Sequence, residues 1–328
     1  MNIIHVHTHG TRHTDPNWKW RLLLTLAFFV VIGQSLLAQP QGGSSDCRDE
    51  QLLCNGPWQY NYFVINIPEY PSCPLTVTYR IRECGPNTFY YQLFDIDWQI
   101  PDINNPNDPS NPCYDLHNAY LEASSGVGPV SQDQFLQNLF HSAVKRFARM
   151  LFDQRLTWAQ NELAQDPNDP ARQAKLQSFL CPNGEKIFRA TYATCMSAVH
   201  GEFPLQGGYR TDTSGTNAGN TTSTLPPDIP KPMEFKIKYY ACNAEALCCL
   251  REFRMCYNEA TQTTRTYWKT TPPAEMGICP IDPPDVDVIR QSNPGFQVGH
   301  CMPYCDAGEY TPPMIEEENP AIPDISKK

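Results

Sequence analysis

The sequence predicts an α+β protein in which two small antiparallel β-rich modules, stapled by disulfides, flank a helical insertion. Strand-like runs near both ends, one long amphipathic helix between them and 14 cysteines support this. The 31 prolines predict that long uninterrupted elements are few. The expected segments are a first module at 39–116, the insertion at 117–184, a linking strand at 185–204, a flexible Gly/Thr/Asn/Pro loop at 205–232, a second module at 233–305 and an acidic, proline-containing tail at 306–328.

The N-terminal segment predicts export. Residues 22–32 form an apolar run that follows Lys19 and Arg21, and a small residue, Ala38, lies at its exit. This pattern is typical of a secretory signal peptide at 1–38, and the run is short for a membrane span. An uncleaved anchor is the alternative interpretation. We therefore expect a secreted, periplasmic or cell-surface protein with no stable membrane span after cleavage.

The charge disfavours one class of partner. Removal of residues 1–38 takes away three basic residues and one acidic residue, which shifts the formal charge from −10 to −12. A nucleic-acid binder normally neutralises phosphates with an excess of basic side chains. We therefore expect no nucleic-acid partner.

The cysteines predict disulfides. Their number is even, and in an exported chain the default is oxidised pairs. Zinc knuckles would need paired C-x₂-C motifs, which the chain lacks. The expected disulfide cysteines are Cys47, Cys54, Cys73, Cys84, Cys113, Cys181, Cys195, Cys242, Cys248, Cys249, Cys256, Cys279, Cys301 and Cys305.

Two sets of strands are expected, because β-branched and aromatic residues gather between turn residues. The first set covers 60–67, 75–83 and 89–98, and the second covers 234–240, 249–257 and 263–270. A gapless overlay of 63–84 on 235–256 matches five residues. This overlay indicates either a duplicated β module or two segments that share a β-rich composition.

The middle of the chain predicts a helical pair. Ser131 and Gln134 form a capping box, and an apolar stripe follows it to about residue 164. Asp169 can cap a second, shorter helix that begins at Pro170 and ends near Leu180.

Catalytic and metal motifs are scarce. The chain has no phosphate-binding glycine loop, no G-x-S-x-G elbow and no H-E-x-x-H motif. Asp95 and Asp97 share one face of a strand, which we expect to be its solvent side. Asp102, Asn104 and Asp108 are weak calcium candidates, because calcium takes several loop oxygens. We expect no cofactor.

Aromatic residues on the strands are the candidate binding residues: Trp58, Tyr60, Tyr90, Tyr91, Tyr267 and Trp268. If exposed, they could stack on sugar rings or anchor a surface protein; otherwise they fill a thin core. The favoured function is an exported structural or recognition protein without catalysis, with a glycan or another surface protein as partner classes. The alternative is a secreted, glycosidase-like hydrolase that uses dispersed carboxylates such as Asp95 and Asp97.

Overall fold

The computed structural model describes residues 54, 56–100, 108–204, 233–242, 248–273, 278–305 and 314–318, with only the backbone of 203–204 and 314–318. All of them belong to one of two units of the chain, residues 42–328. The expected signal peptide (1–38), the expected loop (205–232), Cys47, Asp102 and Asn104 lie outside the described residues.

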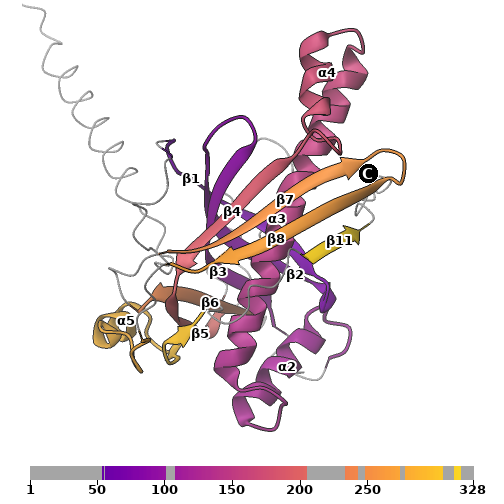
Figure 1. Ribbon diagram of the computed structural model, residues 1–328. Helices are drawn as coiled ribbons and strands as arrows, with labels where there is room; N and C mark the ends of the chain where they lie inside the picture. The colour runs from indigo at the N-terminus through magenta and orange to yellow at the C-terminus, as the bar shows by residue number, and fades with distance from the viewer. Residues whose placement is uncertain are drawn as a thin grey trace, which may run out of the picture. The chain divides into compact units, whose positions relative to one another are not determined.

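Within these residues, eleven mostly antiparallel strands form one sheet, together with helices, which confirms the α+β class (Figure 1). The first three strands form a meander near the expected positions: β1 (Gln59–Ile67), β2 (Tyr70–Glu83) and β3 (Thr88–Gln99). Alternating small, β-branched and aromatic residues fit this pleated surface.

The sheet divides beside β3. The first half of β3 pairs in parallel with β4, and its second half pairs antiparallel with β6. One branch continues through β4 (Lys186–Ala193), β7 (Cys248–Asn258), β8 (Thr263–Thr271) and β11 (Met314–Glu318). The other continues through β6 (Met233–Ala241), β5 (Cys195–Pro204), β9 (Gln297–Val298) and β10 (Met302–Pro303).

The segment expected as one strand at 185–204 is two strands that serve different branches. It breaks at Thr194 between β4 and β5. Because β4 pairs with β7 and β5 pairs with β6, this ribbon passes from one branch to the other.

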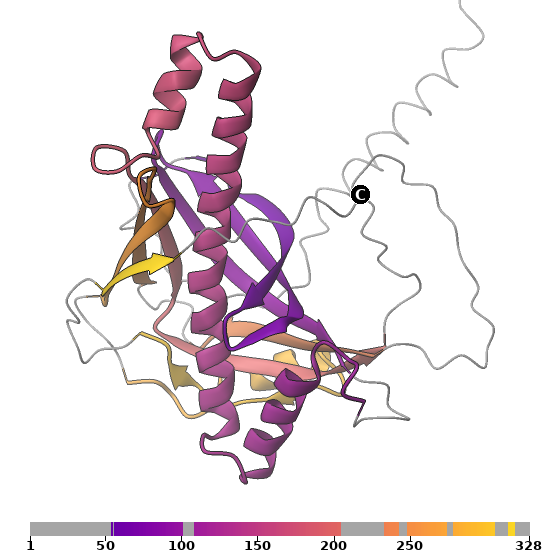
Figure 2. The same cartoon turned by 90° about the vertical axis from the view of Figure 1, so that its right-hand side faces the viewer.

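The helix α3 (Gln132–Gln165) packs between the branches. The side chain of Ser131 accepts a hydrogen bond from the Gln134 amide, which confirms the expected N-cap. Phe147 contacts Tyr79 and Tyr91 of the meander. About two helical turns earlier, Phe140 contacts Tyr192, Tyr239 and Tyr304 around the division of the sheet. Figure 2 shows strands on both sides of α3.

The shorter helices differ partly from expectation. Asp169 caps α4 (Pro170–Gln177), which projects with the end of α3 beyond the sheet (Figures 1 and 2). The helices α2 (Tyr114–Ser125) and α5 (Val286–Ser292) were not expected. The acidic tail expected at 306–328 contains strand β11, which pairs with β8. In the part of the chain described, no helix is long and apolar enough to cross a membrane.

The strand pairing differs between the two segments that the overlay matches. β1 and β2 pair with each other, whereas β6 pairs with β3 and β5, and β7 pairs with β4 and β8. The strands of both expected modules belong to a single sheet.

Six disulfides join described cysteines: Cys54–Cys84, Cys73–Cys113, Cys181–Cys256, Cys195–Cys279, Cys242–Cys301 and Cys249–Cys305. Cys248 is also disulfide-bonded, and no cysteine of the described residues is free. Such a density indicates an oxidising, extracytoplasmic compartment. The Cys249–Cys305 bond links β7 of one branch to Cys305, the second residue after β10 of the other.

We predict that Cys249→Ser/Cys305→Ser destabilises the protein more than Cys54→Ser/Cys84→Ser. Loop entropy contributes about 4 kcal/mol in each case, because the sequence separations are 56 and 30. Only the first pair joins the two branches, so its loss also loosens the packing between them. Urea unfolding of the two variants measures the difference. Equal losses of stability in the two variants would contradict the role of the Cys249–Cys305 bond in holding the branches together.

Candidate functional site

A row of aromatic and charged residues crosses the sheet on the face opposite α3. The hydroxyl of Tyr91 donates to the Val144 carbonyl of α3 at 2.8 Å, so its neighbour Tyr90 points to the other face. Strand register places the members of this row side by side. We call it the aromatic–cation ladder: Trp58, Arg82, Tyr90, Arg189, Glu252 and Lys269.

Cations and rings alternate along the ladder. The guanidinium of Arg82 lies 4.3 Å from the ring centroid of Trp58 and 5.6 Å from that of Tyr90. On the other side of Tyr90, Arg189 lies 5.3 Å from the ring centroid and donates to the hydroxyl at 2.6 Å. Each cation–π contact contributes about 0.5–2 kcal/mol, depending on desolvation. These contacts fix the side chains across several strands.

A polar row runs beside the ladder. Arg80 donates to the Tyr60 hydroxyl at 3.2 Å and to the Gln92 side-chain oxygen at 2.7 Å. The Gln92 amide donates in turn to the Thr191 hydroxyl at 2.9 Å. The second row therefore joins β1 to β4 by hydrogen bonds, and it braces the ladder.

The ladder is accessible at its two ends. Tyr90, Arg82 and Gln92 are buried in the middle. Tyr60 is 49% exposed beside Trp58 at one end, and the Lys269 side chain is 56% exposed at the other. We call these the β1 end (Trp58 and Tyr60) and the β8 end (Tyr267 and Lys269). A ligand can reach the protein at either end.

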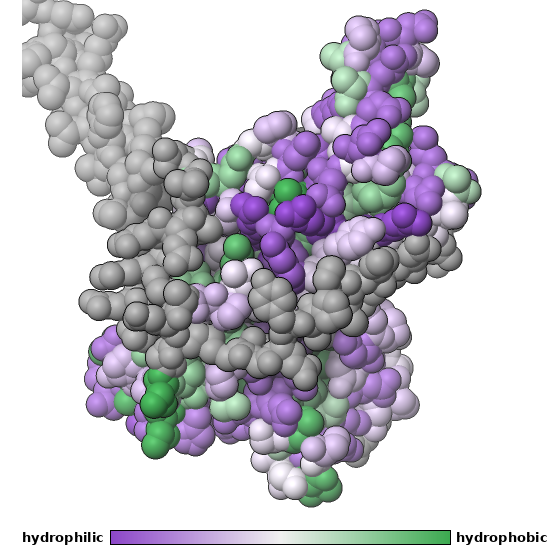
Figure 3. Space-filling view, in the orientation of Figure 1, coloured by the Kyte–Doolittle hydropathy of each residue, from purple (hydrophilic) through white to green (hydrophobic). Residues whose placement is uncertain are grey.

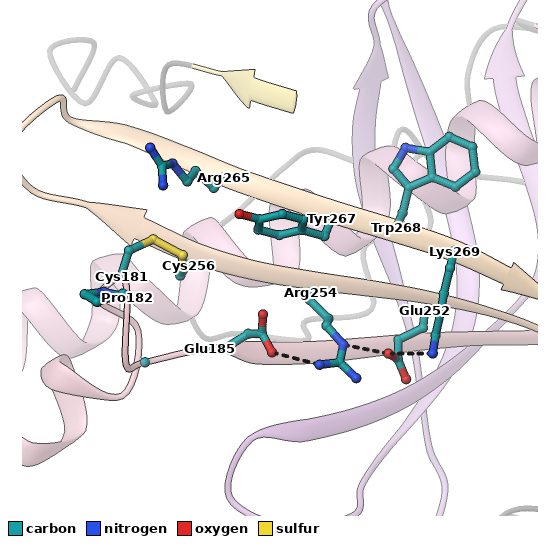
Figure 4. Close-up of a pocket in the computed structure, with 11 residues that line it drawn as sticks. Cys181, Pro182, Glu185, Glu252, Arg254, Cys256, Arg265, Tyr267, Trp268 and Lys269 are labelled. Carbon is teal, nitrogen blue, oxygen red and sulfur yellow. Dashed lines mark hydrogen bonds and ion pairs between the residues drawn. A yellow bond between two sulfur atoms is a disulfide. The ribbon is translucent and has the colours of Figure 1, made fainter. Parts of the chain in front are cut away.

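The β8 end contains a pocket of about 430 Å³ (Figure 4). This volume lies within the usual range for small-ligand sites, about 300–1,000 Å³. The loop between α4 and β4 and the strands β7 and β8 line it, and the Cys181–Cys256 disulfide fixes the loop to β7. Mostly hydrophilic side chains lie over β7 and β8 in Figure 3. The charged residues that line the pocket are Glu185, Glu252, Arg254, Arg265 and Lys269.

Glu252 organises the cations around the pocket. Its oxygens accept from Arg254 Nε at 2.7 Å and from Arg189 Nε at 2.8 Å, and Lys269 Nζ lies 3.7 Å away. Burial alone would raise the pKa of Glu252, but the hydrogen bonds from Arg254 and Arg189 outweigh it and lower the pKa. The carboxylate is therefore ionised at neutral pH, and it holds three cations in place.

The structure places the expected aromatic residues differently. Trp58 and Tyr60 lie at the β1 end, and Tyr267 lines the pocket. The expectation that Tyr90 and Tyr91 could be exposed is wrong: Tyr90 is buried within the ladder, and Tyr91 is in the core against α3. Trp268 also borders the pocket, but it points away from Tyr267 (Figure 4) because side chains alternate along β8.

The expectation that Asp95 and Asp97 face solvent is also wrong. Both carboxylates are buried, and Lys236 Nζ lies 3.5 Å from one and 3.6 Å from the other. Asp97 Oδ1 has no hydrogen-bond partner among the described residues. Burial raises the pKa of Asp97 to about 7, although Lys236 opposes this. Neither aspartate lines the pocket.

The calcium candidates gain no support from the described residues. Asp108 accepts a hydrogen bond from the Ser110 amide at 2.9 Å in an exposed turn, and hydrogen bonds from the Ser110 side chain and amide lower the pKa of Asp108. No group of three His, Cys, Asp or Glu side chains is arranged for a metal ion in the described part of the chain.

Sequence reasoning missed Arg189, Glu252, Arg254 and Lys269. The available signal was charge inside a strand: Arg251, Glu252 and Arg254 lie between Cys249 and Cys256. That pattern indicates a polar sheet face, but only the strand register brings these residues together with Arg189. No protein-family model, curated protein or solved structure matches the chain.

We predict that Glu252→Gln destabilises the protein by about 3 kcal/mol, because it leaves three cations around a neutral, buried side chain. Added sulfate should restore part of the loss by screening the cations. Glu185→Gln is the control, since its ion pair with Arg254 at 3.4 Å is exposed and should change stability by less than about 1 kcal/mol. Chemical unfolding checks both, and similar losses would argue against the central position of Glu252.

We predict that Asp97→Asn removes a pH dependence. The folded pKa of Asp97 lies near 7, above its ordinary value of 3.8, so folding binds the proton more tightly. The stability that this group contributes is present below about pH 4 and is lost as the pH rises through 7. Between pH 4 and 8, the free energy of unfolding of Asp97→Asn should therefore rise relative to that of wild type by up to about 4 kcal/mol.

Urea unfolding across that pH range measures the Asp97→Asn difference, with Asp287→Asn as a control on the exposed face of α5. A difference between wild type and Asp97→Asn that stays constant with pH would contradict the raised pKa of Asp97.

Proposed function

We propose that the protein is exported and serves recognition outside the cytoplasm, without catalysis, through the two exposed ends of the aromatic–cation ladder. The observation that carries this proposal is the ladder itself: rings and guanidinium groups that strand pairing and cation–π contacts hold in fixed positions. The six disulfides support an oxidising compartment.

Rigidity favours binding over a purely structural role for this face. A side chain that is already held in its bound position loses little conformational entropy when a ligand arrives. Arg80 hydrogen-bonds Tyr60, and the rings of Tyr60 and Phe94 stack with centroids 6.1 Å apart. The exposed Tyr60 ring is thereby presented to solvent in a fixed orientation, as in many recognition surfaces.

One observation favours the alternative, a secreted hydrolase. Asp97 has a pKa raised to about 7 and lies on the same strand as Asp95, and perturbed carboxylates are common in active sites. Against this, both carboxylates are buried around Lys236 and neither borders the pocket. Recognition therefore has the stronger support.

Binding to immobilised polymers tests the proposal. We expect the purified, oxidised protein to be retained by at least one member of a panel of neutral and acidic polysaccharides and purified surface proteins. Tyr60→Ala should weaken retention several-fold, since it removes the exposed ring of the β1 end. Reducing ends released from each polysaccharide are measured in parallel, and none should appear.

Two outcomes would overturn the proposal. Absence of retention on every member of the panel contradicts recognition. Release of reducing ends that Asp97→Asn abolishes, while Asp287→Asn preserves it, supports the hydrolase instead.

A further inference from the structure

The pocket at the β8 end holds an excess of positive charge on an acidic chain. Three cations, Arg189, Arg254 and Lys269, lie around the two acids Glu252 and Glu185, while the whole chain carries a formal charge of −10. A local excess of cations on a chain of opposite net charge favours an anionic ligand at this place.

The cations are arranged so that one of them remains available. Arg254 and Arg189 occupy hydrogen-bonding positions on Glu252, one on each oxygen. Lys269 Nζ lies 3.7 Å from Glu252, beyond hydrogen-bonding distance, and this is the one ion pair that Lys269 makes among the described residues. Its ammonium group at the exposed rim can donate to an incoming anion without breaking a hydrogen bond.

An aromatic ring lies between the charges. Tyr267 points to the same face of β8 as Arg265 and Lys269, and strand register places it opposite Arg254 (Figure 4). The span from Arg265 to Lys269 is about 13 Å. A tyrosine offers an apolar ring face and a polar hydroxyl at one place. The site therefore suits a ligand with a flat apolar face and an anionic substituent at its edge.

The topology of the sheet distinguishes between classes of ligand. A peptide that adds a strand to a sheet needs a free edge. The outer edge of β8 pairs with β11 from Thr264 to Trp268, so the pocket is reached from the face of the sheet. Nucleic acid is disfavoured by the acidity of the chain as a whole. A saccharide ring stacked on Tyr267 fits the face, and its acidic group meets Lys269 and Arg254.

We infer that this pocket binds an acidic saccharide unit, with the sugar ring on Tyr267 and its carboxylate or sulfate on Lys269 and Arg254. The inference rests on the proposed recognition function and specifies the ligand class at the β8 end. It involves no bond cleavage.

Isothermal titration with defined probes tests it: oligogalacturonate as a carboxylated saccharide, heparin-derived oligosaccharide as a sulfated one and a neutral maltooligosaccharide. At least one acidic probe should bind, more tightly than the neutral one and more weakly as salt is raised. The stronger of the two acidic probes identifies carboxylate or sulfate as the preferred group.

Variants locate the site. Lys269→Gln should weaken binding of the acidic probe about tenfold, the value of one charge-assisted hydrogen bond, and Tyr267→Ala should weaken it at least as much. Lys175→Gln is the matched control, because it removes the same charge from α4, away from the pocket, and should leave affinity unchanged. Melting curves of each variant confirm that folding is retained.

Several results would overturn the inference. Equal binding of neutral and acidic probes, or insensitivity to Lys269→Gln, contradicts an anion site while leaving recognition through the β1 end intact. Tighter binding of polyglutamate or oligothymidylate than of either acidic saccharide assigns the pocket to another ligand class. Retention by no polymer at all contradicts the proposed function together with this inference.

Discussion

The position of β3 is the constraint on which the rest of the structure depends. Its hydrogen bonds are divided among β2, β4 and β6, so both of its edges are used and both of its faces are covered. Successive side chains of β3 point to opposite faces, and those on both faces are therefore buried. On one face this burial places Tyr91 against α3. On the other it forces Asp95 and Asp97 to share Lys236, because a buried carboxylate needs a compensating charge.

The division of the sheet at β3 creates a second requirement, which the aromatic core and the disulfides meet. Two diverging branches leave a space that neither sheet face can fill alone. Phe140 of α3 fills it against Tyr192 and Tyr239, one from each branch. The Cys249–Cys305 bond then holds the branches at that separation. Crosslinks here complement a core that is already closely packed, since most buried apolar residues form one extended cluster.

Local signals predicted most elements, and non-local ones did not. Ser131 and Gln134 specify the start of α3 through bonds within four residues, so the sequence suffices. The alternation of Asp95 and Asp97 with apolar residues resembles a half-exposed strand, and nothing local reveals that β6 and its Lys236 cover that face. The aromatic–cation ladder could not be predicted from the sequence for the same reason, because it exists only once the register of several strands is fixed.

The location of the pocket follows from the same register. The ladder carries positive charge from the middle of the sheet toward β8, and a half-buried guanidinium such as that of Arg189 is stabilised by a carboxylate nearby. Glu252 meets that need on the neighbouring strand, and it also draws Arg254 and Lys269 toward itself. One buried acid thus gathers more cations than it can neutralise, and the surplus emerges where the sheet reaches solvent. The charge that stabilises the fold and the charge offered to a ligand have a single origin.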